Sequence, residues 1–307
     1  MFMDFSLLSM DKEIFAFKSP FFALEKLDDK KYNYYIELEF YYSRINKRRE
    51  IMEWNEFFLR FSLWQGGGIL AEDCFDWNKM LGEEKGSVLQ FLDGCAEWQK
   101  EQGELLAKKY KQDIKKIEGN SIVFIGDSIT ADRFGYRGIV TQAAELEATS
   151  IAFSCATSTD MFRYACEKSI SGQLVSVMIG TNDAYLVGGR RKRPIVSMEE
   201  FRRNICGIFE MCKENGAQVI CMTIPTMSED KYRRANKINN KTNSNANIKK
   251  YNEIIMEEAR KQGVHVVDIY EKLLECDEEE VFSEDGIHLS PVGQCILADM
   301  WLNEMTK

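Results

Sequence analysis

Histidine is nearly absent from this sequence, since His265 and His288 are the only two among 307 residues. Any acid–base mechanism that needs an imidazole near neutral pH must therefore use one of these two positions. The sequence also lacks a run of about 18 apolar residues, and its first residues, MFMDFSLLSMDKE, lack the pattern of a signal peptide. We predict a cytoplasmic protein without a membrane partner.

Paired cysteines are missing as well. The nine cysteines include no CxxC pair, which argues against both a disulfide framework and a zinc ribbon and suits a reducing compartment. A formal net charge of -9 disfavours nucleic acid as a general partner. Neither GxGxxG nor GxxxxGK[ST] occurs, which argues against a nucleotide-binding protein.

From about residue 119 the chain alternates short apolar runs with amphipathic stretches, a pattern typical of βα units around a parallel sheet. Helices are expected near 159–170, 198–215 and 247–262, and a last one from Ser290 and Pro291. Five strands are expected, in 121-SIVFIG, 149-TSIAF, 173-QLVSVMIG, 218-QVICMTIP and 264-VHVVDI.

The first 118 residues have a different character, and we assign them to an accessory module that is mainly helical or mixed α+β. The stretch from 84 to 116 has helical spacing, whereas 31–61 is ambiguous between helix and strand. The predicted catalytic domain then covers residues 119–307. Nothing in the first module indicates a particular chemistry or oligomeric state.

Three polar motifs follow predicted strands or precede the last predicted helix. Ser128 comes after the first strand in 126-GDSI, and Asn182 comes after the third in 180-GTND. Asp285 and His288 are close enough in 285-DGIHLS for one loop to supply a base and the carboxylate that orients it. Ligands of open parallel sheets bind at the carboxyl ends of strands, where Ser128 and Asn182 are predicted to lie.

Each motif also has an ordinary structural interpretation. Ser128 could cap a helix, Asn182 could form a turn, and the neighbouring Asp127 and Asp183 are expected to shape their loops by hydrogen bonding. His265 lies among β-branched residues and is predicted to be a strand residue. The catalytic interpretation depends on the three motifs occurring together.

In that order and position, GDSI, GTND and DGIHLS resemble the SGNH or GDSL hydrolase family, and 251-YNEII and 291-PVGQ add weaker similarity. The resemblance covers residues 119–305. It implies a flavodoxin-like three-layer α/β/α sandwich and a serine esterase or acylhydrolase without metal or organic cofactor.

The resemblance also implies roles for individual residues. Ser128 would be the nucleophile, His288 the base and Asp285 its partner, while the Ser128 N–H and Asn182 would belong to the oxyanion hole. The family usually supplies a third donor from a glycine after the second strand, and we align Cys155 with that glycine. A cysteine there keeps the backbone N–H but tolerates positive φ less well than glycine.

The predicted function is hydrolysis of a small-molecule ester through an acyl-serine, with a short acyl group favoured and an O-acetylated carbohydrate as one candidate. Two alternatives remain, an acyltransferase that uses the same acyl-serine and a catalytically silent binding module. Basic residues after GTND could attract an anionic substrate or form a solvated loop. They are Arg190, Arg191, Lys192 and Arg193.

Overall fold

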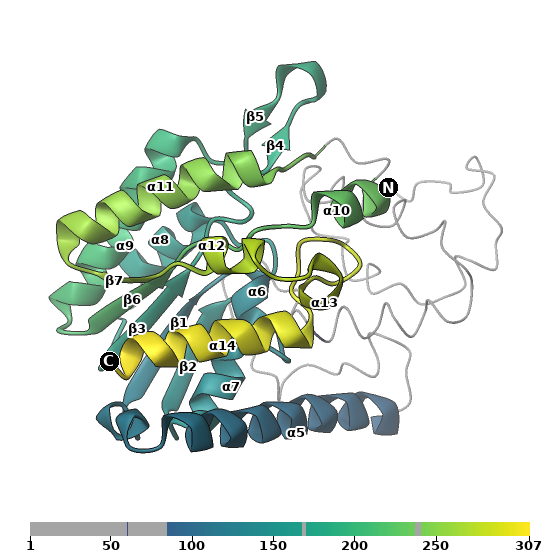
Figure 1. Ribbon diagram of the computed structural model, residues 1–307. Coiled ribbons are helices and arrows are strands. Elements are labelled where there is room, and N and C mark those ends of the chain that lie inside the picture. The colour runs from purple at the N-terminus through teal and green to yellow at the C-terminus, as the bar shows by residue number, and fades with distance from the viewer. Residues whose placement is uncertain (1–59, 61–84, 168–169, 237–240) are drawn as a thin grey trace. The chain divides into compact units, whose positions relative to one another are not determined.

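Five apolar runs form one parallel sheet in the computed structural model (Figure 1), which describes residues 60, 85–167, 170–236 and 241–307. The sheet order is β2-β1-β3-β6-β7, and every pairing in it is parallel. This is the flavodoxin-like order, as predicted. The strands are β1 (Ser121–Gly126), β2 (Glu147–Ala152), β3 (Leu174–Met178), β6 (Gln218–Met222) and β7 (His265–Val267).

Helices cover both faces of this sheet, which gives the expected three layers (Figure 1). One face packs against α8 (Ser158–Glu167), α9 (Met198–Glu214) and α11 (Asn245–Gln262). The other packs against α5 (Lys85–Tyr110), α7 (Tyr136–Ala143) and α14 (Pro291–Met305). The shorter helices are η4 (Asp113–Lys116), α6 (Ser128–Ala131), α10 (Glu229–Ala235), α12 (Ile269–Leu274) and α13 (Glu278–Val281). A separate strand pair consists of β4 (Leu186–Val187) and β5 (Arg193–Pro194), with η5 (Gly189–Arg191) between the two strands.

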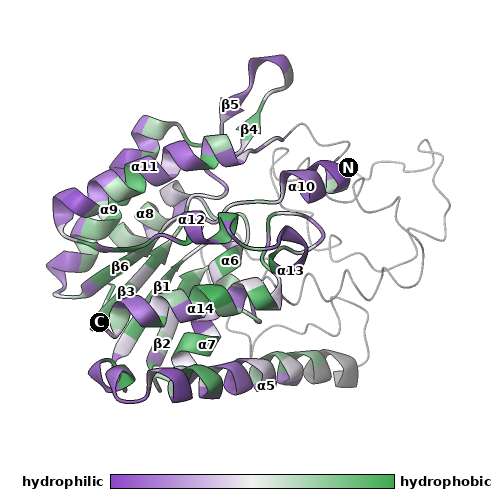
Figure 2. Cartoon of the chain, viewed as in Figure 1, coloured by the Kyte–Doolittle hydropathy of each residue, from purple (hydrophilic) through white to green (hydrophobic). Residues whose placement is uncertain are grey.

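The central strands have apolar side chains on both faces, as expected for a sheet covered by helices on both sides. In β1, Val123 and Ile125 pack toward α8, α9 and α11, while Ile122 and Phe124 pack toward α7 and α14. All four side chains are buried. Figure 2 shows the outer side of α11 as mainly hydrophilic, in contrast to the strands that it helps to cover.

The body around the sheet begins earlier in the chain than the predicted boundary at residue 119. The chain divides into two compact units, and the second unit includes Gly94–Lys307. In the second unit, Leu106, Ala107 and Tyr110 of α5 pack against the same apolar cluster as α7 and α14. The helix predicted from residue 84 is present, but its second part belongs with the sheet.

Most of the predicted accessory module, including the ambiguous stretch 31–61 apart from Arg60, lies outside the described residues. Its role stays a prediction. Among the helices that are described, none is long and apolar enough to cross a membrane.

Candidate active site

The turn after β1 places Ser128 at the start of a helix. Asp127 caps α6, because its carboxylate accepts a hydrogen bond of 3.0 Å from the backbone N–H of Ile129. Gly126 is required at this turn, since a Cβ there would come within 2.6 Å of the Met178 carbonyl oxygen on β3. Ser128 is consequently the first residue of α6, where the helix leaves the backbone N–H without an intrahelical acceptor.

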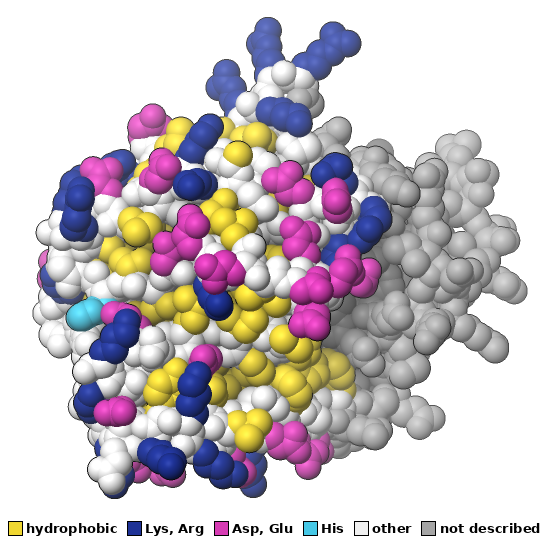
Figure 3. All heavy atoms as spheres, viewed as in Figure 1, with side chains coloured by type: hydrophobic (Ala, Val, Ile, Leu, Met, Phe, Trp, Pro, Cys, Tyr) yellow, Lys and Arg dark blue, Asp and Glu magenta, His cyan; other side chains and the backbone are white. Residues whose placement is uncertain are grey.

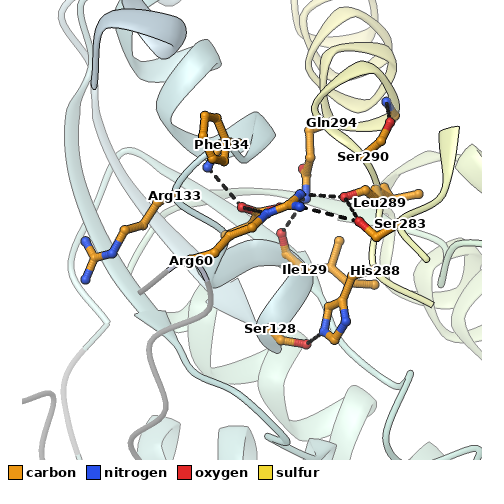
Figure 4. Close-up of polar contacts among 12 residues, drawn as sticks. Arg60, Ser128, Ile129, Arg133, Phe134, Ser283, His288, Leu289, Ser290 and Gln294 are labelled. Atoms are coloured by element: carbon orange, nitrogen blue, oxygen red, sulfur yellow. Dashed lines mark hydrogen bonds and ion pairs between the residues drawn. The ribbon is translucent and has the colours of Figure 1, made fainter. Parts of the chain in front are cut away.

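A hydrogen-bonded chain of three side chains begins at Ser128. Its Oγ lies 2.8 Å from Nε2 of His288, and Nδ1 of His288 lies 2.5 Å from Oδ2 of Asp285. Figure 4 shows the Ser128 and His288 side chains pointing toward each other. The structure therefore brings the three predicted residues into contact. In this order the imidazole can accept a proton from the hydroxyl while the carboxylate keeps the imidazole in place.

The short loop between α13 and α14 fixes both the imidazole and its carboxylate. The Ser283 N–H donates to the carbonyl oxygen of His288 at 2.8 Å, and an isolated bridge joins Phe282 to Leu289. Oδ1 of Asp285 accepts from the backbone N–H groups of Ile287 and His288 at 2.9 and 3.0 Å. These contacts leave Oδ2 of Asp285 directed at the imidazole.

The environment of Asp285 favours its ionised form. Burial opposes ionisation, but the charge of His288 and hydrogen bonds from His288 and the backbone N–H of Ile287 outweigh it and lower the pKa of this carboxyl below its ordinary value. Asp285 is thus a carboxylate at neutral pH, as the partner of an imidazolium must be.

The other two residues predicted for an oxyanion hole, one through its side chain and one through its backbone N–H, follow the strands on either side of β1. Asn182 follows β3, and its Nδ2 donates one hydrogen bond of 2.9 Å to the carbonyl oxygen of Ala156. An amide nitrogen has two N–H groups, so this bond uses only one of them. Cys155 follows β2 and has a φ of +59°, the left-handed region that favours glycine. The backbone conformation at Cys155 is thus one that a glycine would adopt without strain.

Asp127 and Asp183 have the loop-shaping roles that the sequence predicts. Asp183 is buried and accepts hydrogen bonds of 3.0 Å from the backbone N–H of Ser158, the first residue of α8, and another from the Ser158 hydroxyl. Burial raises the pKa of Asp183 to about 7, against the opposing effect of these hydrogen bonds. Burial also raises the pKa of Asp127.

Replacing Asp183 with asparagine should reduce the pH dependence of stability between about pH 4 and 7. The pKa of Asp183 rises from its ordinary 3.8 to about 7 on folding, so the folded protein holds an extra proton in this window and loses stability as pH rises through it. Each pKa unit corresponds to ~1.4 kcal/mol. Thermal melting of both proteins should show that Tm falls more steeply with rising pH in the parent than in the variant. Equal slopes would contradict a raised pKa at Asp183.

The predicted anion-attracting residues lie on a projecting hairpin. Arg190 and Arg191 belong to η5, between β4 and β5, and Arg193 begins β5. Figure 3 shows basic side chains fanning out from its tip into solvent, and Figure 1 shows that tip well away from α6. The structure does not bring these residues together with Ser128 and His288, and their attraction of an anionic substrate stays a prediction.

His265 is in a strand, as predicted. It is the first residue of β7, and its side chain is 58% exposed with Nδ1 3.9 Å from Glu304. A group of residues near the site was not predicted from the sequence: the carboxylate of Asp132 pairs with Arg60 and also accepts a hydrogen bond from Gln294. The only sequence signal for it was Gln294, the last residue of 291-PVGQ.

Metal ligands are not clustered in the part of the chain that the structure describes: it contains no group of three or more His, Cys, Asp or Glu side chains able to hold an ion.

Comparison with known proteins extends the sequence resemblance. The model of the GDSL-like lipase/acylhydrolase family matches residues 124–296. No curated protein matches the chain. Among solved structures, a lipase/acylhydrolase from Enterococcus faecalis has 20% identity and a TM-score of 0.48, with 61% of this chain and 95% of that chain covered. An acetyl xylan esterase from Geobacillus stearothermophilus has 22% identity and a TM-score of 0.48, with 61% and 95% covered.

Proposed function

Because the chain belongs to the GDSL-like lipase/acylhydrolase family and is an esterase or acylhydrolase, we propose that it hydrolyses small-molecule esters through an acyl-serine at Ser128. One observation carries this proposal: the Ser128 hydroxyl lies 2.8 Å from the imidazole of His288, whose other nitrogen is held by Asp285. A serine beside a base that is itself oriented by a third group is the arrangement of an activated nucleophile.

The proposed reaction has two stages. His288 takes the proton of the Ser128 hydroxyl as its oxygen attacks the acyl carbon, and returns the proton to the departing alcohol. A water molecule then attacks the acyl-serine and loses a proton to His288, which passes it to Oγ of Ser128 as the acyl–oxygen bond breaks and the acid is released. The carboxylate of Asp285 stabilises the imidazolium that forms at each stage.

The developing oxyanion would be held by neutral donors in this proposal. The backbone N–H groups of Ser128 and Cys155 and the second N–H of Asn182 are the candidates. Their elements support this assignment, because β1 lies between β2 and β3 in the sheet and Cys155 and Asn182 follow those two neighbours. Donors fixed by strand ends need little rearrangement as the charge develops.

Asn182→Ala should lower kcat by about 10²- to 10³-fold with little change in KM, since a donor of this kind acts on the transition state. Steady-state kinetics on one ester measures both constants. The same side chain also donates to Ala156, so thermal melting of the variant must accompany the kinetics. A fall in kcat of less than about threefold, in a protein that melts like the parent, would remove Asn182 from the oxyanion hole.

The acyl group and alcohol are proposed on the sequence alone, as a short acyl chain and, as one candidate, an acetylated sugar. A panel of esters of increasing acyl length, with acetylated sugars included, tests this directly. An anionic ester in the same panel tests Arg190, Arg191 and Arg193, since neutralising them should raise KM for that ester alone if they bind it.

A fluorophosphonate label tests the nucleophile independently of substrate choice. The label should attach to the peptide that contains Ser128, because a serine activated by a base reacts with such reagents. Ester turnover without labelling of this peptide, or no turnover of any ester in the panel, would contradict the proposed function.

A further inference from the structure

A cluster of buried polar side chains joins the helix of Ser128 to the loop of His288 (Figure 4). Asp132 ends α6 as its C-cap and is fully buried. Its carboxylate receives two hydrogen bonds from Arg60, one of 2.8 Å from Nε to Oδ1 and one of 2.7 Å from Nη2 to Oδ2. This is the bidentate geometry in which arginine holds a carboxylate most firmly.

The same guanidinium also contacts the loop that carries the base. Nη2 of Arg60 donates to the carbonyl oxygen of Leu289 at 2.6 Å, and Nη1 lies 3.4 Å from the hydroxyl of Ser283. Leu289 follows His288 directly, and Ser283 donates its backbone N–H to the His288 carbonyl. One side chain therefore contacts both the end of the nucleophile helix and the residues on either side of the base.

Other contacts keep Arg60 in this place. Its carbonyl oxygen accepts from the backbone N–H of Arg133 at 3.0 Å, and its guanidinium lies 5.6 Å from the centre of the Phe134 ring. The side chain is only 15% exposed. Since its donors are directed at Asp132, Leu289 and Ser283, the guanidinium is arranged to hold protein groups rather than a substrate.

Gln294 on α14 completes the attachment. Its Nε2 donates to Asp132 at 2.9 Å and to the carbonyl oxygen of Ile129 at 3.1 Å, while its Oε1 accepts from the backbone N–H of Tyr136. Ile129 is the residue after the nucleophile. Asp132 is thus shared by an arginine bound to the His288 loop and a glutamine bound to α6.

We propose that Arg60 is a positioning residue that sets the separation of Ser128 and His288 by holding α6 and the His288 loop to one rigid guanidinium. The inference rests on the proposed roles of Ser128 and His288. Arg60 also lies outside residues 124–296, the part that the family model matches. The chain therefore supplies this element of its active site from a segment that precedes the family domain.

Arg60→Gln and Arg60→Lys test the proposal in the full-length protein. Glutamine removes the positive charge and the pair of N–H groups that bind Asp132. We therefore expect kcat to fall about a hundredfold, the effect expected when reacting groups shift by about 1 Å. Lysine keeps the charge beside Asp132 but cannot also reach Leu289 and Ser283, so kcat should fall about tenfold in a folded protein. KM should stay within about twofold in both, because neither change touches the substrate.

Arg202→Gln is the matched control. Arg202 on α9 also pairs with a buried carboxylate, that of Glu258 on α11, but on the face of the sheet opposite α7 and α14. Removing it breaks an arginine–carboxylate pair in the helix layer that covers the other face of the sheet. It should leave kcat within about twofold of the parent.

A second readout does not depend on ester turnover. The protein has only two histidines, so ¹³C-labelled imidazoles give two NMR signals, with exposed His265 as an internal reference. Both Arg60 variants should shift or broaden the His288 signal and leave that of His265 unchanged, whereas Arg202→Gln should leave both in place. This readout decides the role of Arg60 even if the esterase assay were to fail for the parent.

The possible results distinguish a positioning role of Arg60 from a role in stability alone. An Arg60→Lys protein with the parent kcat and the parent His288 signal would overturn the proposal, whatever becomes of Arg60→Gln. Failure of both Arg60 variants to fold, with Arg202→Gln folded, would also overturn it, because Arg60 would then serve stability. A fall in kcat at constant KM, together with a selective change at His288, is the result that we expect.

Discussion

Ser128→Ala should lower kcat for ester hydrolysis on the order of 10⁶-fold, the loss typical of removing a serine nucleophile that works with a base. The change deletes one oxygen, the one that lies 2.8 Å from His288. KM should change little, because the substitution removes a single oxygen and leaves the other side chains of the site unchanged. Steady-state kinetics with active-site titration of the parent measures the loss, and fluorophosphonate labelling should disappear with it.

Folding should survive this substitution. Alanine has the highest helix propensity, and α6 is capped by Asp127 rather than by Ser128. Thermal melting therefore serves as the control for the kinetic loss. If Ser128→Ala kept turnover and labelling, the nucleophile would lie elsewhere. Cys155→Ser would then be the next variant to assay, because Cys155 carries a thiol and is one of the residues predicted for the oxyanion hole.

His288→Ala should be almost as damaging as Ser128→Ala, because a serine hydroxyl without its base is a weak nucleophile and the residues of such a triad act as a unit. The expected loss in kcat is again on the order of 10⁶-fold. The kinetics should be measured over a range of pH, since hydroxide at high pH partly replaces a missing base. Equal activity of the variant and the parent would exclude His288 as the base.

His265→Ala is the natural control, since it removes the chain's other imidazole. His265 is 58% exposed, and its nearest carboxylate, Glu304, is 3.9 Å away. A pair of this kind contributes little to stability, about 0 to 1 kcal/mol. We therefore expect kcat within about twofold of the parent and a small change in Tm. A large loss of activity from His265→Ala would reverse the assignment of the two histidines.

The sheet could be predicted because its strands carry strong local signals. Runs such as 121-SIVFIG are short, apolar and rich in β-branched residues, and each is followed by an amphipathic helix. The catalytic residues could be predicted for a related reason. Each lies in a compact motif at a strand end or beside the last helix, so sheet topology alone brings Ser128 and Asn182 to one edge.

The parts that could not be predicted depend on contacts between distant positions. Arg60 and Asp132 are 72 positions apart, and no local pattern in either segment indicates that they pair. The raised pKa of Asp183 likewise depends on burial, which the sequence of its loop does not reveal. The strand pair β4 and β5 has only two residues in each strand, too few for a hydrophobic period to be visible.

The close packing of α5 on α7 affects how the gene could be shortened. At Gly103 a Cβ would lie 2.6 Å from Cβ of Gln142 and 3.1 Å from the carbonyl oxygen of Ile139, so only glycine lets the two helices approach this closely. Truncation at residue 119, where the family resemblance begins, would remove this helix and expose the apolar side chains beneath it. It would also remove Arg60. A shortened protein that keeps both α5 and Arg60 therefore has to begin before residue 60.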